Sequence, residues 1–240
     1  MTEEQKSDIF LTEQQPAKPV RTLETLLKLY AEGHRNFSGS DLRGATVDII
    51  DDEIEDLNLQ DIILRGSNLK AIKFTRSGTV LKVDLTGSDL SECNLQGANL
   101  SFSILDQCSF THSDLRNVSL ACQSCRGSDF IRAKFLNASI SSNTDFTASD
   151  FTEADFRSTQ LSGKFSYSNF CGANFQKASF ANFEANGADF SNANFQDVEF
   201  RTNKAVDFSY SYYNLQTKFS SDFDPIERKM ELVKDEIADD

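Results

Sequence analysis

The sequence predicts an all-β fold in which the chain winds into a coil and each five-residue segment forms one side. Three observations predict it: a bulky apolar residue recurs every five positions, the residue two places before it is usually small, and the residue between them is often Asp or Asn. A period of five fits neither an α-helix, whose period is about 3.6, nor a flat strand, whose period is about 2. The five-residue unit is therefore itself the structural repeat.

The bulky positions, which we call centres, form one long series. Phe37, Leu42 and Val47 stand first, and a run from Ile49 to Phe74 keeps the period but is offset by one residue. After residue 84 the predicted centres are Leu85, Leu90, Leu95, Leu100, Leu105, Phe110, Leu115, Leu120, Cys125, Phe130, Phe135, Ile140, Phe146, Phe151, Phe156, Leu161, Phe165, Phe170, Phe175, Phe180, Ala185, Phe190, Phe195, Phe200 and Ala205. One residue is added near 141–143 and one is lost near Gly163, and we expect a bulge or tight corner at each place.

The small positions indicate which side chains share the interior. Alternation over two residues turns the small residue toward the same side as its centre, where it must fit beside a bulky neighbour. At one place the sizes are exchanged, because Phe183 occupies the small position before Ala185. Close packing at constant volume then predicts that Phe183 is buried.

Units such as Ala98-Asn99-Leu100 and Ala188-Asp189-Phe190 resemble the Ala-(Asp/Asn)-Leu-X-X pattern of the pentapeptide repeat family. The resemblance covers about residues 36–215, and the segment LLKLYAEGHRNFSGSDLRGA is similar to the start of the repeats in cyanobacterial members. It implies a right-handed quadrilateral parallel β-helix, with four units per coil and about nine coils stacked about 4.8 Å apart. It also implies short α-helical caps at the ends.

The chain divides into four predicted parts: a disordered tail (1–20), an N-terminal capping helix (21–35), the pentapeptide repeat β-helix (36–223), and a C-terminal helix with an acidic tail (224–240). In the first helix Thr22 suits the N-cap and Gly33 suits the end. Its apolar face, at helical spacing, consists of Leu23, Leu26, Leu27 and Tyr30.

The predicted C-terminal helix begins with Asp224, Pro225 and Glu227, an acidic variant of the capping box. Its apolar stripe consists of Ile226, Met230, Val233 and Ile237. Two interpretations stay open. The stripe caps the last coil, or it dimerises as C-terminal elements do in topoisomerase-protecting members of the family, so the protein is a monomer or a dimer through this helix.

Two segments interrupt the repeat and supply the candidate interaction surface. The pattern departs most between Val47 and Val80, where a loop or distorted coil is expected. Near the other end, Tyr210 and Tyr212 are expected to face outward and Tyr213 inward. Two interpretations of the outward tyrosines stay open: they anchor a protein interface, or they pack at the end of the coil. The candidate residues are Asp51, Asp52, Glu53, Glu55, Asp56, Tyr210 and Tyr212.

The sequence offers no recognisable catalytic, cofactor or metal site. Cys122 and Cys125 form a lone CxxC, which is weak evidence for zinc. The repeat places Cys125 inside and Cys122 outside, so we expect them to diverge as reduced thiols. His34 and His112 have no Ser or Cys partner at a recognisable spacing. We therefore expect a protein that is not an enzyme.

Charge and hydropathy exclude further classes. With 24 Lys and Arg against 37 Asp and Glu, the net charge is −13, which argues against direct nucleic-acid binding. The mean hydropathy is −0.42 and no run of apolar residues is long enough for a transmembrane helix. The first 20 residues lack the apolar stretch of a signal peptide, so a cytoplasmic protein without membrane contact is expected.

Two functions agree with these features. The first is a non-catalytic scaffold whose rod binds an unidentified protein partner. The second is an acidic DNA mimic that binds a type II topoisomerase such as gyrase. The family resemblance implies this function, because the members that protect topoisomerases are acidic rods. The sequence shows no long projecting loop of the kind those protectors carry.

Overall fold

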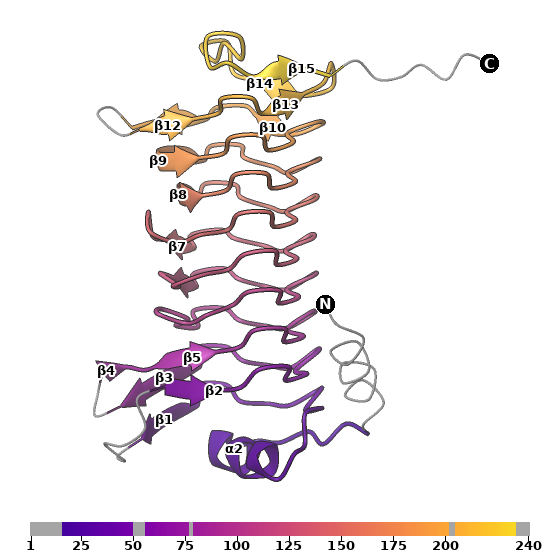
Figure 1. Ribbon diagram of the computed structural model, residues 1–240, viewed down its shortest axis with the longest axis vertical. Coiled ribbons are helices and arrows are strands. Elements are labelled where there is room, and N and C mark those ends of the chain that lie inside the picture. Colours follow the sequence, from indigo (N-terminus) through magenta and orange to yellow (C-terminus); the bar gives the residue numbers. More distant parts are fainter. Residues whose placement is uncertain (1–15, 50–55, 77–78, 202–204, 234–240) are drawn as a thin grey trace, which may run out of the picture.

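The computed structural model describes residues 16–49, 56–76, 79–201 and 205–233 of the chain. Over these ranges the chain winds into a parallel β-solenoid, mostly β, with one short helix at its N-terminal end (Figure 1). No helix in these ranges has the length and apolar composition needed to cross a membrane. Most of the predicted tail, residues 1–15, lies outside the described residues.

The helix α2 (Leu23–Ala31) covers the first turn of the solenoid, as the sequence predicts. The Thr22 hydroxyl accepts a hydrogen bond from the Thr25 amide and so caps the helix. Leu23 and Leu26 are buried against the core. The segment before the helix also contacts the solenoid: the Lys18 amide donates to the Asn36 carbonyl at 2.9 Å.

Four ladders of parallel backbone pairing run along the rod, and we number the four faces after them. Face 1 consists of Asn36, Ile63, Asp89, Ser109, Asp129, Asp150, Asn169 and Asp189, followed by β13 (Tyr212–Tyr213) and β15 (Glu231–Leu232). Face 2 consists of Asp41, Asn68, Asn94, Asp114, Lys134, Asp155 and Asn174, followed by β10 (Asn194–Phe195) and β14 (Lys218–Phe219). Each step along a ladder is one turn of the solenoid.

Faces 3 and 4 contain the longer strands. Face 3 consists of β1 (Thr46–Ile49), β3 (Lys73–Arg76), Asn99, β6 (Ser119–Leu120), β7 (Ser139–Ile140), β8 (Gln160–Lys164), β9 (Ser179–Glu184) and β11 (Glu199–Phe200). Face 4 consists of β2 (Asp56–Asn58), β5 (Lys82–Asp84), Ile104, Ser124, Asp145, Lys164, Glu184 and β12 (Val206–Asp207). The short strand β4 (Thr79–Val80) pairs antiparallel with β3.

The spacing of ladder partners shows where residues are added or lost. On face 1 the step from Asp129 to Asp150 is 21 residues and the step from Asp150 to Asn169 is 19 (150 − 129 and 169 − 150). The predicted addition and loss are both present, and the register of β8 against β9 shifts between Leu161 and Gly163. Larger steps mark inserted segments in the first two turns and in the turn that contains residues 202–204.

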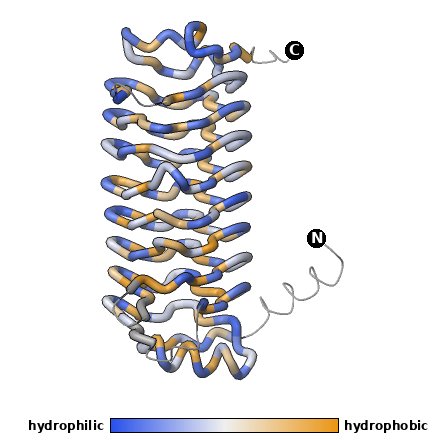
Figure 2. The backbone as a smooth tube through the Cα atoms, turned by 60° about the vertical axis from the view of Figure 1, so that its left-hand side comes forward, coloured by the Kyte–Doolittle hydropathy of each residue, from blue (hydrophilic) through white to orange (hydrophobic). Residues whose placement is uncertain are grey.

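The predicted centres fill the interior with stacked rings. Phe110, Phe130, Phe151, Phe170 and Phe190 stack one above another with successive ring centroids 4.8, 4.9, 4.9 and 4.9 Å apart. This distance equals the usual spacing of neighbouring strands, so the rings stack because the backbone does. Hydrophobic and hydrophilic residues accordingly alternate around each turn (Figure 2).

The exchange of sizes at Phe183 and Ala185 is confirmed. Both side chains are fully buried, and the Phe183 ring lies 5.0 Å from the ring of Phe165. The next predicted centre, Ala205, is wrong: Ala205 is exposed, and Phe208 is buried beside Ala185. Extra residues between Phe200 and Val206 displace the register, and the Ala185 amide accordingly donates to the Asp207 carbonyl.

The small interior positions do more than save space. The Ser128 hydroxyl donates to the Leu105 carbonyl at 2.6 Å and accepts the Cys108 amide at 3.1 Å, so it joins adjacent turns at their corner. Buried Ser113 and Ser168 donate to carbonyls of the preceding turn in the same way. Serine is favoured here because it is small and satisfies backbone groups that the corner leaves without a partner.

The C-terminal helix is a wrong prediction. Residues 225–229 form a turn and Glu231–Leu232 form β15, which pairs with β13 and extends face 1. The Asp224 carboxylate accepts the amides of Ile226 and Glu227, as a helix cap does, but only one turn follows. Glu231 and Leu232 instead pair as a strand with the open edge of β13. Of the predicted stripe, Met230 is buried, Ile226 and Val233 are exposed, and Ile237 lies outside the described residues.

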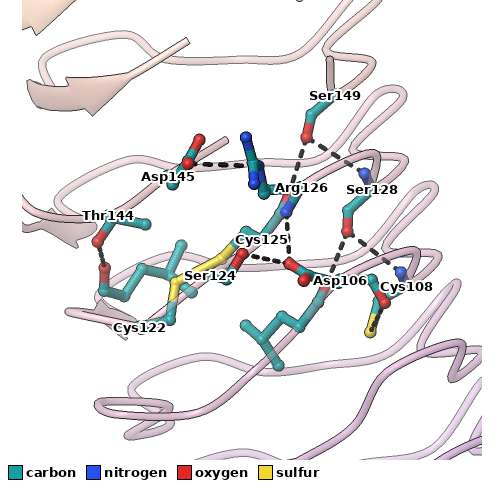
Figure 3. The surroundings of a disulfide bond; sticks show 12 residues. Asp106, Cys108, Cys122, Ser124, Cys125, Arg126, Ser128, Thr144, Asp145 and Ser149 are labelled. Carbon is teal, nitrogen blue, oxygen red and sulfur yellow. Dashed lines mark hydrogen bonds and ion pairs between the residues drawn. A yellow bond between two sulfur atoms is a disulfide. The ribbon is translucent and has the colours of Figure 1, made fainter. Parts of the chain in front are cut away.

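The predicted separation of Cys122 and Cys125 is also wrong, because the structure joins them by a disulfide (Figure 3). Both side chains are buried. The corners before and after them, at Asn117 and Gly127, have positive φ, whereas Cys122 does not. The chain therefore turns this corner differently and directs Cys122 inward toward Cys125.

Candidate interaction surfaces

The predicted tyrosines lie near the C-terminal end of the rod. Tyr210 stands at the corner between faces 4 and 1 and is 66% exposed, and Tyr212 lies on face 1 in β13 and is partly exposed. Tyr213 is half-buried, and its ring meets the ring of Phe219 edge-on at 5.4 Å. The predicted outward and inward directions are therefore observed.

A third tyrosine, which sequence reasoning missed, stands on the same corner. Tyr167 is 73% exposed and occupies this corner two turns before Tyr210. Its ring covers Gly187, where an added Cβ would lie 2.9 Å from Tyr167 Cδ1. Glycine in the intervening turn thus leaves room for the ring. We call Tyr167, Gly187, Tyr210 and the adjoining Tyr212 the tyrosine edge.

The predicted acidic residues do not join this edge. Asp51, Asp52, Glu53 and Glu55 lie outside the described residues. Asp56 lies in β2, where its carboxylate accepts a hydrogen bond from Lys82 at 2.7 Å. Because β2 and β13 lie near opposite ends of the rod, Asp56 and the tyrosines belong to separate surfaces (Figure 1).

Face 2 carries a basic groove that the sequence did not indicate. The groove has a volume of about 500 Å³. Its lining, which defines the face 2 groove, is Arg116, Lys134, Leu136, Asp155, Arg157, Ser158, Gln176 and Lys177. Four cations and one carboxylate therefore face each other across it, on a protein whose net charge is −13.

Ion pairs within face 2 hold two of these cations in place. Arg116 Nη2 lies 2.5 Å and Nε 2.8 Å from the two Asp114 oxygens, and Arg157 binds Asp155 in the same bidentate way at 2.7 and 2.8 Å. Such pairing fixes the plane of each guanidinium. Burial alone would raise the pKa of Asp114, but hydrogen bonds from Arg116 and Gln96 outweigh it and lower this pKa to about 2.

The lowered pKa of Asp114 predicts an acid-dependent loss of stability. Because the folded pKa of about 2 lies below the ordinary value, the contribution is complete above about pH 4 and is lost as the pH falls toward 2. Asp114→Asn should therefore show a smaller fall in unfolding free energy between pH 6 and about pH 2.5 than the parent protein, measured by urea denaturation. Parallel curves for the two proteins would contradict this.

The remaining titratable groups of the described residues bear on whether the chain has a metal or nucleophilic site. Within the described part of the chain, His, Cys, Asp and Glu form no group of three or more placed to hold a metal ion. Cys93 is buried, and burial raises the pKa of its thiol to about 12. A thiol with such a pKa is a poor nucleophile at neutral pH.

Comparison with known proteins agrees with this geometry. A family model described as "Pentapeptide repeats" matches residues 84–120, 139–163 and 164–201, with eight copies. These residues are pentapeptide repeats. The matched repeats include most of the turns that carry the face 2 groove, and curated proteins give no match to the chain.

Solved structures of pentapeptide repeat proteins resemble the chain at low identity. HetL, a protein involved in heterocyst differentiation regulation from the cyanobacterium Nostoc, is 20% identical over 83% of this chain and 91% of its own, with a TM-score of 0.38. QnrB1, a plasmid-mediated fluoroquinolone resistance protein, is 18% identical over 82% and 92%, with a TM-score of 0.41. A pentapeptide repeat protein of the Arabidopsis thaliana thylakoid lumen is 28% identical over 52% and 66%, with a TM-score of 0.23. At these scores the likenesses carry no argument about function.

Proposed function

We propose that this protein is a non-catalytic scaffold that binds a protein partner through the tyrosine edge. The observation that carries the proposal is the exposure of Tyr167 and Tyr210 on one corner of the pentapeptide repeats. Tyrosine offers a large contact area, a polar tip and few rotatable bonds, which is why it is enriched among the residues that dominate interfaces.

The backbone beneath these tyrosines is fixed before any partner arrives. The Tyr167 amide donates to the Asn186 carbonyl, and the Tyr210 amide donates to the Lys229 carbonyl, both at 2.9 Å. Both hydrogen bonds reach the next turn of the solenoid, so only the side chains lose freedom on binding. Because the backbone loses little conformational freedom on binding, the affinity for a partner is higher.

Affinity capture tests the proposal. The full chain and its Tyr167→Ser/Tyr210→Ser variant would be used as baits in extract of the native organism, with quantitative mass spectrometry of the retained proteins. We expect a specific partner whose recovery falls about tenfold with the variant. Phe102→Ser is the matched control, because Phe102 is 60% exposed with φ 62° at a different corner. Equal recovery of the partner by the unchanged chain and by its Tyr167→Ser/Tyr210→Ser variant would refute the proposal.

Face 1 supports an alternative function, the DNA mimic that binds a type II topoisomerase. Its outward positions include Asp89, Asp129, Asp150 and Asp189 in one ladder. Burial, together with repulsion from Asp150, raises the pKa of Asp129. The adjoining face 2 is basic at its groove, which a mimic of uniformly charged DNA would not need. Supercoiling by gyrase measured with added protein at micromolar concentration distinguishes the two: inhibition supports the mimic, and unchanged supercoiling supports the scaffold.

A further inference from the structure

We infer that the face 2 groove binds an acidic segment of a protein partner, with an apolar side chain of that segment seated on Leu136. The inference rests on the proposed function in taking the partner to be a protein. It concerns a different surface, because the groove adjoins the corner between faces 2 and 3 and the tyrosine edge lies between faces 4 and 1.

The charge of the groove selects an anion. Asp155 already pairs with Arg157, and Asp114 already pairs with Arg116. Among the described residues, Lys134 and Lys177 form no ion pair with an acidic side chain. Lys134 also interacts electrostatically with Asp155. The four cations of the groove still face only Asp155 and the adjoining Asp114, so positive charge remains in excess and a complementary ligand carries negative charge.

The regular turns of the solenoid set the positions of the groups that the ligand meets. Asp114, Lys134, Asp155 and Asn174 are consecutive ladder partners, so the residues two places later also lie one above another. That outer column reads Arg116, Leu136, Arg157 and Gln176. At about 4.8 Å per turn, the two guanidinium groups lie about 10 Å apart along the rod with Leu136 between them.

This order favours a ligand with alternating charged and apolar groups. Leu136 is partly exposed in the groove, and the aliphatic stems of the neighbouring Arg and Lys residues supply further apolar surface. A peptide in the polyproline II conformation has three residues per turn and advances about 3.1 Å per residue. Carboxylates three residues apart then lie on the same side of the peptide, at about the spacing of the guanidinium groups. An apolar residue between these carboxylates would then contact Leu136.

A nucleic acid fits this surface less well. A long polyanion that follows the rod would meet a protein with a net charge of −13 and would adjoin the acidic ladder of face 1. A short acidic peptide meets only the groove. The charge distribution of the rod therefore favours a peptide over a nucleic acid, although both are anionic.

Fluorescence anisotropy with a defined probe tests the inference. The probe is a labelled peptide, Glu-Leu-Ser-Glu-Leu-Ser-Glu, titrated with the full-length protein at about 50 mM salt, where charge pairing is weakly screened. We expect saturable binding that weakens about tenfold in the Lys134→Gln/Lys177→Gln variant. Lys164→Gln is the matched control, since Lys164 is an exposed lysine on face 4. A probe with Gln in place of Glu should not bind, and one with Ser in place of Leu should bind more weakly.

Other outcomes overturn the inference. Equal binding of the Glu and Gln probes, or no effect of the double lysine variant, would show that the groove does not select acidic peptides. Stronger binding of a single-stranded oligonucleotide than of the probe would assign the groove to nucleic acid. Tighter probe binding after removal of residues 234–240, KDEIADD, would show that the chain's own acidic terminus is the occupant. The Tyr167→Ser/Tyr210→Ser variant should bind the probe normally, so failure of the tyrosine edge and failure of the groove are distinguishable.

Discussion

Replacing Phe183 with alanine should lower the free energy of unfolding by about 3–5 kcal/mol. The ring is fully buried, and it lies 5.0 Å from the rings of Phe165 and Phe180 and 5.5 Å from that of Phe208. Ala185, also buried beside it, is too small to fill the space that the ring leaves. The variant therefore combines a lost transfer free energy with a cavity between turns.

Urea denaturation of Phe183→Ala and of Phe102→Ala measures this effect. Phe102 is largely exposed, so its replacement should change stability by less than about 0.5 kcal/mol. The double variant Phe183→Ala/Ala185→Phe restores the usual order of sizes and should recover part of the loss. Equal midpoints for the two single variants would mean that Phe183 is not part of the core.

Gly163→Ala should destabilise the protein by about 2–5 kcal/mol, through backbone strain and overpacking together. Gly163 has φ 115°, a conformation that side chains disfavour, and it lies at the register shift where its turn is one residue short. A Cβ there would lie 2.7 Å from the Thr144 carbonyl oxygen and 3.2 Å from that of Ser141. Both contacts are with backbone, which cannot rotate away.

Gly127→Ala is the matched control for this substitution. Gly127 has φ 61°, and a Cβ there would meet nothing within 4 Å, so only the backbone preference is lost, about 1 kcal/mol. Thermal unfolding of the two variants by circular dichroism should place Gly163→Ala clearly below Gly127→Ala. If Gly163→Ala were the more stable of the two, the close approach of Thr144 would be wrong.

The repeat could be predicted from sequence because its information is local. A centre every five residues and a small partner two residues earlier specify the interior wherever the count is unbroken, and the exchange at Phe183 and Ala185 follows from volume alone. The prediction failed where partners distant in sequence decide the structure. Asp224 and Pro225 are genuine helix-starting signals, yet pairing with β13 makes the following residues a strand.

The surfaces were harder to predict than the core. Tyr210 and Tyr212 were recognised individually, but Tyr167 joins them only once Phe208, rather than Ala205, is placed in the interior. The four cations of the face 2 groove lie about one turn apart in the chain, so no sequence window brings them together. A count of outward residues by turn, made in the observed register, could have found both surfaces.

The changes of register seen along the rod have a consequence for how the protein can vary. In each turn up to Glu199 the chain advances five residues from face 1 to face 2 and five more from face 2 to face 3. It also advances five residues from face 4 to face 1 of the next turn, so every added or missing residue falls between face 3 and face 4. That corner, which also holds Cys122, is a seam that absorbs changes in length. Faces 1 and 2 keep their register from turn to turn. Segments inserted into the seam would therefore leave the face 2 groove unchanged.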